Sequence, residues 1–304
     1  MGMELIEVEA FLAIVQAGGF TRAAARLRLS QPAISRRIDL LERELGAPLF
    51  ERGRGTVRLT AAGAAFLPYA RAALAATRDG TAAVHALGSG DEGDVTLALV
   101  GTLASTGLVG RLRAFQDARP GVRLALRTAR SDEVGELVRQ GDAALGLRYF
   151  PDPSSALDSR PAGTESLVAV CAAHSRLVGP GEPNAAALAG GPWVGFPVGA
   201  GSSGEPFARL LGQILARAGF DGVEVIPVDS LTAQKRLVEA DFGLGLLPAS
   251  CVEEELRVGT LRLVPVPALT ATVPIFAVTR RDGYLGPAAM SLLAILTSEP
   301  TGGR

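Results

Sequence analysis

A short polar stretch at residues 88–93, made of glycine, serine and acidic residues, divides the chain into two segments with different hydrophobic patterns. Before it, apolar residues recur every three or four positions, as they do on one face of a helix. After it, short apolar runs alternate with helical patterns, which is typical of α/β layers. We therefore expect a domain boundary here, in a chain whose 304 residues suffice for two or three domains.

The basic residues are concentrated in the N-terminal segment. The whole chain carries 30 basic and 31 acidic residues, so its overall charge does not indicate a nucleic-acid partner. Between Phe20 and Thr60, however, nine arginines stand against four acidic residues, which leaves a local charge of +5. A basic module on a nearly neutral chain is expected of a domain that binds phosphate groups.

Three helices are predicted before residue 47. The first has an apolar face made of Leu5, Val8, Phe11, Leu12 and Val15. The glycines at 18 and 19 end this helix, and Thr21 fits the N-cap of a second helix over 22–27. Ser30 fits the N-cap of a third, with Pro32 in the first turn, where a missing N–H costs nothing.

The third helix has an apolar face and an exposed polar face. Its predicted core positions are Ile34, Ile38, Leu41 and Leu45. The same periodicity exposes a second set near the N-terminal end of the helix, Gln31, Pro32, Ser35 and Arg36. Glutamine can read adenine, and arginine can read guanine or bind phosphate, so this face has the chemistry of a DNA recognition helix.

A two-stranded wing is predicted after the third helix, which Gly46 ends. Residues 48–52 and 56–59 have the pattern of short strands, and Arg52 and Arg54 lie at the tip between them. Positive side chains at such a tip can reach the DNA backbone or the minor groove.

Together these segments resemble the signature of the LysR-type transcriptional regulators. The match runs through FTRAAARL at 20–27, LSQPAISRRI at 29–38, LERELG at 41–46, PLFER at 48–52 and LTAAG at 59–63. The resemblance implies an all-α N-terminal domain, 1–59, whose winged helix-turn-helix binds double-stranded DNA at an inverted-repeat promoter site. The expected DNA-contacting residues are Thr21, Arg22, Ser30, Gln31, Pro32, Ser35, Arg36, Arg37, Arg52 and Arg54. The resemblance also implies a bacterial homodimer or homotetramer, with RNA polymerase as a further partner.

A long linker helix over 60–88 is predicted to come next, with Thr60 as its cap. A heptad-like seam runs along it through Leu67, Ala70, Leu74, Thr77, Thr81 and Val84. These small residues suit a close contact between two helices, and the family resemblance implies that the contact is the dimer interface. The alternative is an ordinary amphipathic helix whose apolar face packs within its own chain.

After residue 93 the chain resembles the periplasmic-binding-protein-like effector domain of the same family. Strands are predicted at 95–100, 122–127, 145–148, 167–171, 193–196, 223–227, 243–247, 261–264 and 272–279. They alternate with helices at 108–118, 132–140, 206–218 and 231–239 and a final helix, which predicts parallel sheets covered on both faces. The resemblance implies two α/β lobes within 93–304, with lobe 1 at 93–161 plus 266–304 and lobe 2 at 162–265. Asp241 stands where the family usually has glycine.

A small-molecule effector is expected between the lobes, at the C-terminal ends of strands and the N-terminal ends of helices. The candidate contacts are Thr102, Ser105, Ser131, Arg148, Phe196, Ser202, Ser203, Ser230 and Thr232. Hydroxyls and free N–H groups at helix N-termini favour a carboxylate, so we predict a small organic anion. The alternative for each serine or threonine is a role as a helix cap alone.

Two other function classes fit the sequence less well. A solute-binding protein would leave the DNA-reading pattern unexplained. The loop from Gly199 to Gly204 has the form G-x-G-x-x-G, which binds a dinucleotide when it opens the first βα unit of a Rossmann fold. Here it lies deep in the chain after a very short strand, and no catalytic constellation accompanies it. We therefore expect no enzyme activity.

The remaining features predict a cytoplasmic protein without a metal, a cofactor or a membrane partner. The two cysteines, Cys171 and Cys251, and the two histidines lack the spacing of a zinc site, and we expect both thiols to be buried and inert. The N-terminus lacks the regions of a signal peptide. No charge-free apolar run reaches the roughly 18 residues that a membrane span needs.

Overall fold

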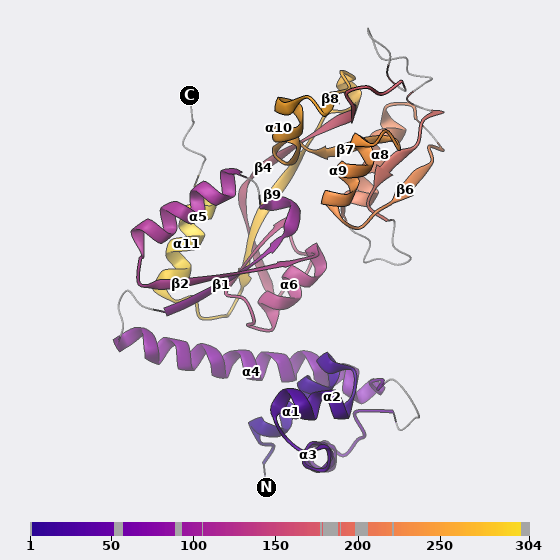
Figure 1. Ribbon diagram of the computed structural model, residues 1–304. Helices are drawn as coiled ribbons and strands as arrows, with labels where there is room; N and C mark the ends of the chain where they lie inside the picture. The colour runs from indigo at the N-terminus through magenta and orange to yellow at the C-terminus, as the bar shows by residue number, and fades with distance from the viewer. Residues whose placement is uncertain are drawn as a thin grey trace. The chain divides into compact units, whose positions relative to one another are not determined.

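The computed structural model describes residues 2–51, 57–88, 93–104, 106–176, 178, 188, 190–197, 206–220 and 222–298. The chain divides into two compact units, of which the first contains Met1–Gly88 and the second contains most of the remaining chain. Figure 1 shows the helices of the first unit in indigo and purple, and the sheet and helices of the second from purple through magenta and orange to yellow.

Three helices and a long fourth one build the first unit: α1 (Leu5–Ala17), α2 (Phe20–Leu27), α3 (Gln31–Leu45) and α4 (Ala61–Gly88). Gly18 and Gly46 end α1 and α3 in the left-handed conformation, with φ of 66° and 68°, as glycine favours. The predicted cap of α3 is confirmed, because the Ser30 hydroxyl accepts the N–H of Ala33 at 3.3 Å. The predicted cap of α2 is wrong: the helix begins at Phe20 after Gly19, so Thr21 lies inside the first turn.

The core of the first unit is centred on Phe11, which is fully buried and lies 5.3 Å, between ring centroids, from both Phe50 and Phe66. The apolar positions in the middle of α1 and α3 face this core as predicted. Leu5 and Leu45 do not: they are 37% and 40% exposed, because they lie at the ends of their helices, beyond the core.

The base of the wing is paired as predicted. Phe50 and Leu59 form an antiparallel bridge, and the N–H of Glu51 donates to the carbonyl of Arg58 at 2.9 Å. The wing tip, with Arg52 and Arg54, lies outside the described residues. The predicted cap of α4 is confirmed, since the Thr60 hydroxyl accepts the N–H of Gly63 at 3.0 Å.

A mixed sheet organises the second unit. Its strands lie in the order β2 (Val122–Ala129), β1 (Gly93–Val100), β3 (Leu145–Tyr149), β9 (Ala271–Arg280), β4 (Leu157–Ala172), β7 (Leu244–Pro248), β5 (Trp193–Gly195) and β6 (Val225–Pro227), with β8 (Leu261–Leu263) paired to β4. β1 is parallel to β2 and β3, and β5 is parallel to β6 and β7, as predicted. The middle of the sheet departs from the predicted parallel arrangement, because β9 is antiparallel to β3 and β4, and β4 is antiparallel to β7.

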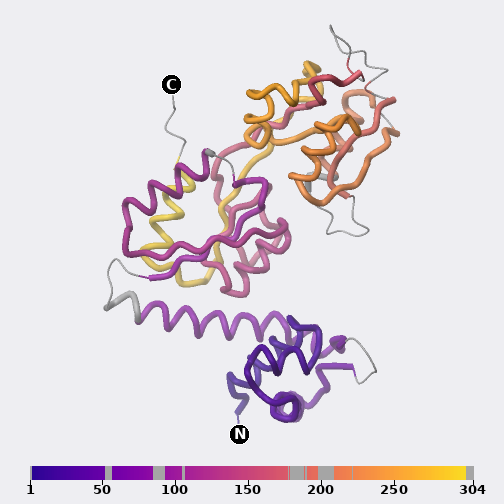
Figure 2. The backbone as a smooth tube through the Cα atoms, in the orientation of Figure 1, coloured from indigo at the N-terminus to yellow at the C-terminus, as the bar shows by residue number. Residues whose placement is uncertain are grey.

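The antiparallel pair β4 and β9 carries the chain between two lobes (Figure 2). Lobe 1 holds β1, β2 and β3 with α5 (Thr106–Ala118), α6 (Ser131–Arg139), α11 (Pro287–Thr297) and the 3-10 turn η1 (Gly101–Leu103). Lobe 2 holds β5, β6, β7 and β8 with α8 (Pro206–Arg217), α9 (Leu231–Glu239) and α10 (Ala249–Val258). The 3-10 turn η2 (Pro267–Leu269) leads into β9.

Besides the short 3-10 turns, two longer segments of the second unit were not predicted, the first half of β4 and helix α10. The first half of β4 contains Pro161 and Gly163, which disfavour a strand, and the pairing with β9 shifts register between them. Helix α10 starts directly after β7, with Pro248 at the N-cap and no side-chain cap, so it lacks the usual start signal.

Asp241 adopts a backbone conformation that suits glycine. Its φ is 61°, in the left-handed region, which suits the glycine that the family resemblance implies at this position. Its Oδ1 is buried and has no hydrogen-bond partner among the described residues. Aspartate is therefore accommodated here with some backbone and desolvation cost.

Candidate nucleic-acid interface and effector site

The N-terminal half of α3 presents the predicted polar face. Gln31, Pro32 and Arg36 are exposed, and Ser35 is half-buried beside them. On the opposite side of the helix, Ile34 is fully buried in the core of the first unit. Since residues four apart lie on one helix face, Gln31 with Ser35 and Pro32 with Arg36 form one surface. This surface has hydrogen-bonding and positively charged groups, as contacts to base edges and phosphates require.

Arg22 has a structural role. Its guanidinium donates to the carbonyl of Ala17 and, at 2.7 Å, to the carbonyl of Gly18, at the C-terminal end of α1. A cation at a helix C-terminus satisfies carbonyls that lack helical partners. Arg22 therefore holds α2 against the end of α1. Thr21 beside it is exposed and remains a candidate for a contact to DNA.

The seam predicted along α4 divides into two halves. Ala70 is buried against the core of the first unit, and Leu67 and Leu74 pack partly against the same core. The second half is exposed, and Val84 has 68% of its surface accessible. The first half of α4 is therefore an amphipathic helix that packs within its own chain, the alternative considered from the sequence. Of the predicted seam, only Thr77, Thr81 and Val84 remain available to a partner helix.

Three candidate effector residues of lobe 1, Thr102, Ser131 and Arg148, are buried, and a fourth lies outside the described residues. Thr102 in η1 donates its hydroxyl to that of Tyr149 at 3.1 Å, and both side chains are buried. Ser131, the first residue of α6, is 1% exposed. Ser105 lies outside the residues that the structure describes.

Arg148 forms a buried ion pair with Asp152, in the turn after β3. The two side chains are 7% and 3% exposed. The Asp152 carboxylate also accepts the N–H of Ser154 at 2.9 Å, and the N–H of Asp152 donates to the Ser159 hydroxyl at 3.0 Å. Arg148 was predicted to contact the effector, but its visible role is to neutralise the carboxylate that orders this turn.

The described candidates of lobe 2 lie nearer the surface. Ser230 caps α9, since its hydroxyl accepts the N–H of Ala233 at 3.4 Å. Thr232 is exposed in the first turn of the same helix, and Phe196 is half-buried after β5. Ser202 and Ser203 lie outside the described residues. The cap alternative therefore applies to Ser230, while Thr232 is accessible.

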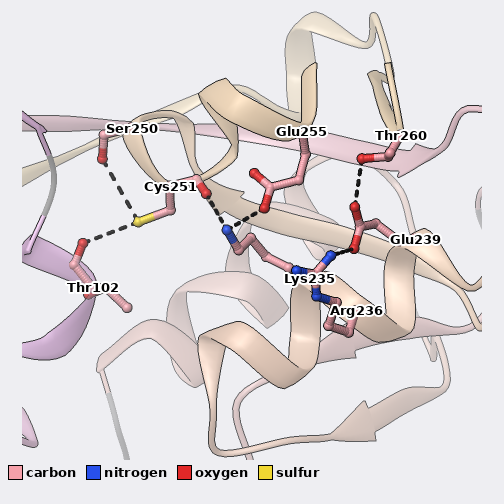
Figure 3. Close-up of polar contacts among 8 residues, drawn as sticks. All are labelled: Thr102, Lys235, Arg236, Glu239, Ser250, Cys251, Glu255 and Thr260. Atoms are coloured by element: carbon pink, nitrogen blue, oxygen red, sulfur yellow. Dashed lines mark hydrogen bonds and ion pairs between the residues drawn. The ribbon is translucent and has the colours of Figure 1, made fainter. Parts of the chain in front are cut away.

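A polar cluster around α10 was missed. Figure 3 shows Lys235 from α9 between the carbonyl of Cys251 and the carboxylate of Glu255, at 3.0 and 2.5 Å. The thiol of Cys251 donates to the carbonyl of Thr102 at 3.2 Å. One sequence signal was available: Lys235 is the only lysine of the chain.

Both cysteines carry free thiols, and burial raises the pKa of each. Cys171 is fully buried, as predicted. Cys251 is only partly buried, contrary to the prediction, but its pKa rises to about 11. A thiol with such a pKa is protonated at neutral pH and therefore a poor nucleophile.

Two kinds of feature are absent from the described ranges. No group of three or more histidine, cysteine, aspartate or glutamate side chains there is placed to hold a metal ion. No described helix combines the length and the apolar character needed to cross a membrane.

A helix-turn-helix unit and a two-lobed α/β domain in one chain define a DNA-binding regulator with a ligand-binding domain. Residues 5–64 match the bacterial regulatory helix-turn-helix protein model of the lysR family, and residues 88–300 match the LysR substrate binding domain. The chain belongs to the LysR family of transcriptional regulators.

Relatives and solved structures agree with this assignment. The chain is 33% identical to the HTH-type transcriptional regulator IlvR of Caulobacter vibrioides, over 98% of both chains. It is 32% identical to the SDS degradation transcriptional activation protein of a Pseudomonas species, over 97% of this chain and 96% of that one. Full-length CbnR, crystallised with its target DNA, matches with a TM-score of 0.65 and 27% identity, over 97% of this chain and 99% of that one.

The protein is thus a DNA-binding transcriptional regulator with an effector-binding domain, and the family and fold class predicted from the sequence are confirmed. Its relatives are named as transcriptional regulators, which is consistent with the expected non-enzymatic regulator. The helix-turn-helix match accounts for the N-terminal pattern that a solute-binding protein would leave unexplained.

Proposed function

We propose that the protein regulates transcription from the bacterial cytoplasm by binding an inverted-repeat promoter site as a homodimer or homotetramer, with RNA polymerase as a further partner. The exposed face of α3 supports this, because Gln31, Ser35 and Arg36 share a surface backed by a rigid core. Arg37 and Ser30 flank this surface, and the wing tip adds Arg52 and Arg54 as backbone contacts. The exposed half of the α4 seam contributes to the subunit contact.

Replacing Arg36 by alanine is expected to weaken binding to the native site by about 1–3 kcal/mol if the side chain touches a base edge. The matched control is Arg43→Ala, since Arg43 is exposed on the same helix but lies in its last turn. Surface changes away from the contact face alter binding by roughly 0.5 kcal/mol or less. Fluorescence anisotropy with DNA from upstream of the protein's own gene, against a scrambled fragment and across salt concentrations, measures both variants. Equal affinities for the two variants and the wild type would contradict this placement of the DNA face.

We further infer that the effector is a small organic anion bound between the lobes, without another cofactor. The support is chemical: Thr232 is accessible in the first turn of α9, where backbone N–H groups and the helix dipole favour negative charge. The candidate contact from lobe 1 is Thr102, which lies in η1 directly after the C-terminal end of β1.

Calorimetric titration of a panel of small carboxylates, each paired with its uncharged amide, tests the anion proposal. We expect at least one carboxylate to bind and its amide to bind more weakly, because the amide lacks the charge that the helix terminus favours. Replacing Thr232 by valine is expected to weaken the carboxylate about 2- to 10-fold by removing one hydrogen bond. Binding of the uncharged partners alone would refute the proposal.

A further inference from the structure

The first turn of α10 connects the two lobes. The thiol of Cys251, in lobe 2, donates to the main-chain carbonyl of Thr102, in η1 of lobe 1, at 3.2 Å. The neighbouring Ser250 donates its hydroxyl to Glu165, in the crossing strand β4, at 2.7 Å. Thr102 is itself held by the hydrogen bond between its hydroxyl and that of Tyr149. The start of α10 is therefore fixed to lobe 1 and to the strand that joins the lobes.

Lys235 fixes α9 to the same helix. Its ammonium donates to the carbonyl of Cys251 at 3.0 Å and pairs with Glu255 at 2.5 Å (Figure 3). The side chains of Lys235 and Glu255 are 21% and 11% exposed, so water screens the pair only weakly. The second oxygen of Glu255, Oε2, is buried and has no hydrogen-bond partner in the part of the chain that the structure describes. The charge of Glu255 is therefore balanced through Lys235.

The residue type at position 235 fits a bridging role. All other basic residues of the chain, histidines apart, are arginines. An ammonium is compact and has three donors, so it can contact a carbonyl and a carboxylate on two successive turns of one helix. A planar guanidinium has its donors in a fixed fork and would not reproduce both contacts in the same space.

We propose that Lys235 and Cys251 are positioning residues that couple the N-terminal part of α9 to Thr102 through α10. The inference rests on the proposed effector site, because Thr232 on α9 and Thr102 on η1 are its candidate contacts from opposite lobes. Displacement of either by an effector moves α10, and with it the contact on the other lobe. The lobes then respond to the ligand together, although α10 itself carries no candidate ligand contact.

The chemistry of the thiol suits this contact. Burial raises the pKa of Cys251 to about 11, so the thiol keeps its proton at neutral pH and remains a hydrogen-bond donor. The titratable and charged groups beside it are Glu165, Lys235 and Glu255. The contact with Thr102 therefore persists across the physiological range of pH.

Hydrogen–deuterium exchange of the full-length protein, without effector or DNA, tests the coupling. The reporter is the N–H of Ala104, which donates to Gly101 in η1 at 3.3 Å. Lys235→Met, in lobe 2, is expected to accelerate exchange of this amide in lobe 1 about 2- to 10-fold, the range that the loss of one hydrogen bond produces. The control is Arg236→Met, because Arg236 is the next residue, is 73% exposed and pairs only with Glu239 among the described ion pairs.

Two further variants make the test decisive. Cys251→Ala is expected to accelerate exchange of the Ala104 amide to a similar extent, and Cys251→Ser, which keeps a donor, to restore it towards the wild-type rate. The coupling would be overturned if, in both Lys235→Met and Cys251→Ala, amide exchange accelerates only in α9 and α10 while the Ala104 amide exchanges at the wild-type rate. If Lys235→Met does not fold, the pair Cys251→Ala and Cys251→Ser decides alone. The exchange experiment contains no ligand, so its outcome does not depend on the anion titration. Failure of the proposed coupling can therefore be distinguished from failure of the anion proposal.

Discussion

Replacing Gly63 by alanine is expected to destabilise the first unit by about 3 kcal/mol, at the upper end of what overpacking costs. A Cβ at this position would lie 2.1 Å from the carbonyl oxygen of Leu49 and 2.9 Å from a methyl carbon of Leu59. The carbonyl cannot retreat easily, because it accepts the N–H of Thr60 at 3.0 Å. Relief of the clash would separate the wing from the start of α4, where both contribute to the core.

Gly80→Ala is the matched control, since Gly80 lies in the same helix and an added Cβ meets nothing within 4 Å. Alanine in an open helical position is expected to stabilise by about 0.5–1 kcal/mol. Denaturant unfolding observed with a probe of each unit measures both changes, because the two units need not unfold together. Unfolding curves for Gly63→Ala that coincide with the wild type would show that the wing and α4 are not packed in this way.

Replacing Asp152 by alanine is expected to destabilise the second unit by about 3–5 kcal/mol, because it leaves the Arg148 charge buried without the carboxylate that balances it. The same change also removes the acceptor of the Ser154 N–H and so loosens the turn after β3. Thermal or denaturant unfolding of the second unit measures the loss.

Asp158→Ala provides the comparison for this variant. Asp158 pairs with Arg281 on the surface, where the two side chains are 39% and 54% exposed, and such pairs contribute about 0–1 kcal/mol. Equal stability of the two variants would mean that the Arg148–Asp152 pair is not structural. Arg148 would then regain its predicted place among the effector contacts.

Much of the secondary structure could be predicted, because apolar periodicity and caps are local signals. Gly18 marks the end of α1, Ser30 marks the start of α3 and Gly46 marks its end, each through its own backbone or side-chain chemistry. Where the local signal is weak, the prediction failed. Pro161 and Gly163 in β4 are tolerated because β9 pairs with that segment, and this partner lies more than a hundred residues away.

The exposed face of α3 could be predicted more completely than the surroundings of the candidate effector residues. The exposed face of α3 follows from helix geometry alone, so Gln31 and Arg36 are exposed as expected. Whether a predicted effector residue is available to a ligand depends on whether neighbouring residues already satisfy its hydroxyl or its charge. Arg148 meets Asp152, and Thr102 meets Tyr149 and Cys251. The contact between Thr102 and Cys251 joins residues 149 positions apart, and no periodicity or spacing encodes it.

The connectivity of the sheet sets the order in which the second unit can be completed during synthesis. β3 pairs with β9, so that Gly146 lies opposite Val278, and every strand of lobe 2 is translated between the two. Lobe 1 consequently leaves the ribosome with β3 as an open edge and without α11, and contacts of such long sequence separation form slowly. Lobe 2 can assemble most of its own sheet first. The nascent regulator therefore exposes an unpaired strand until β9 has emerged, and in that interval it depends most on protection from aggregation.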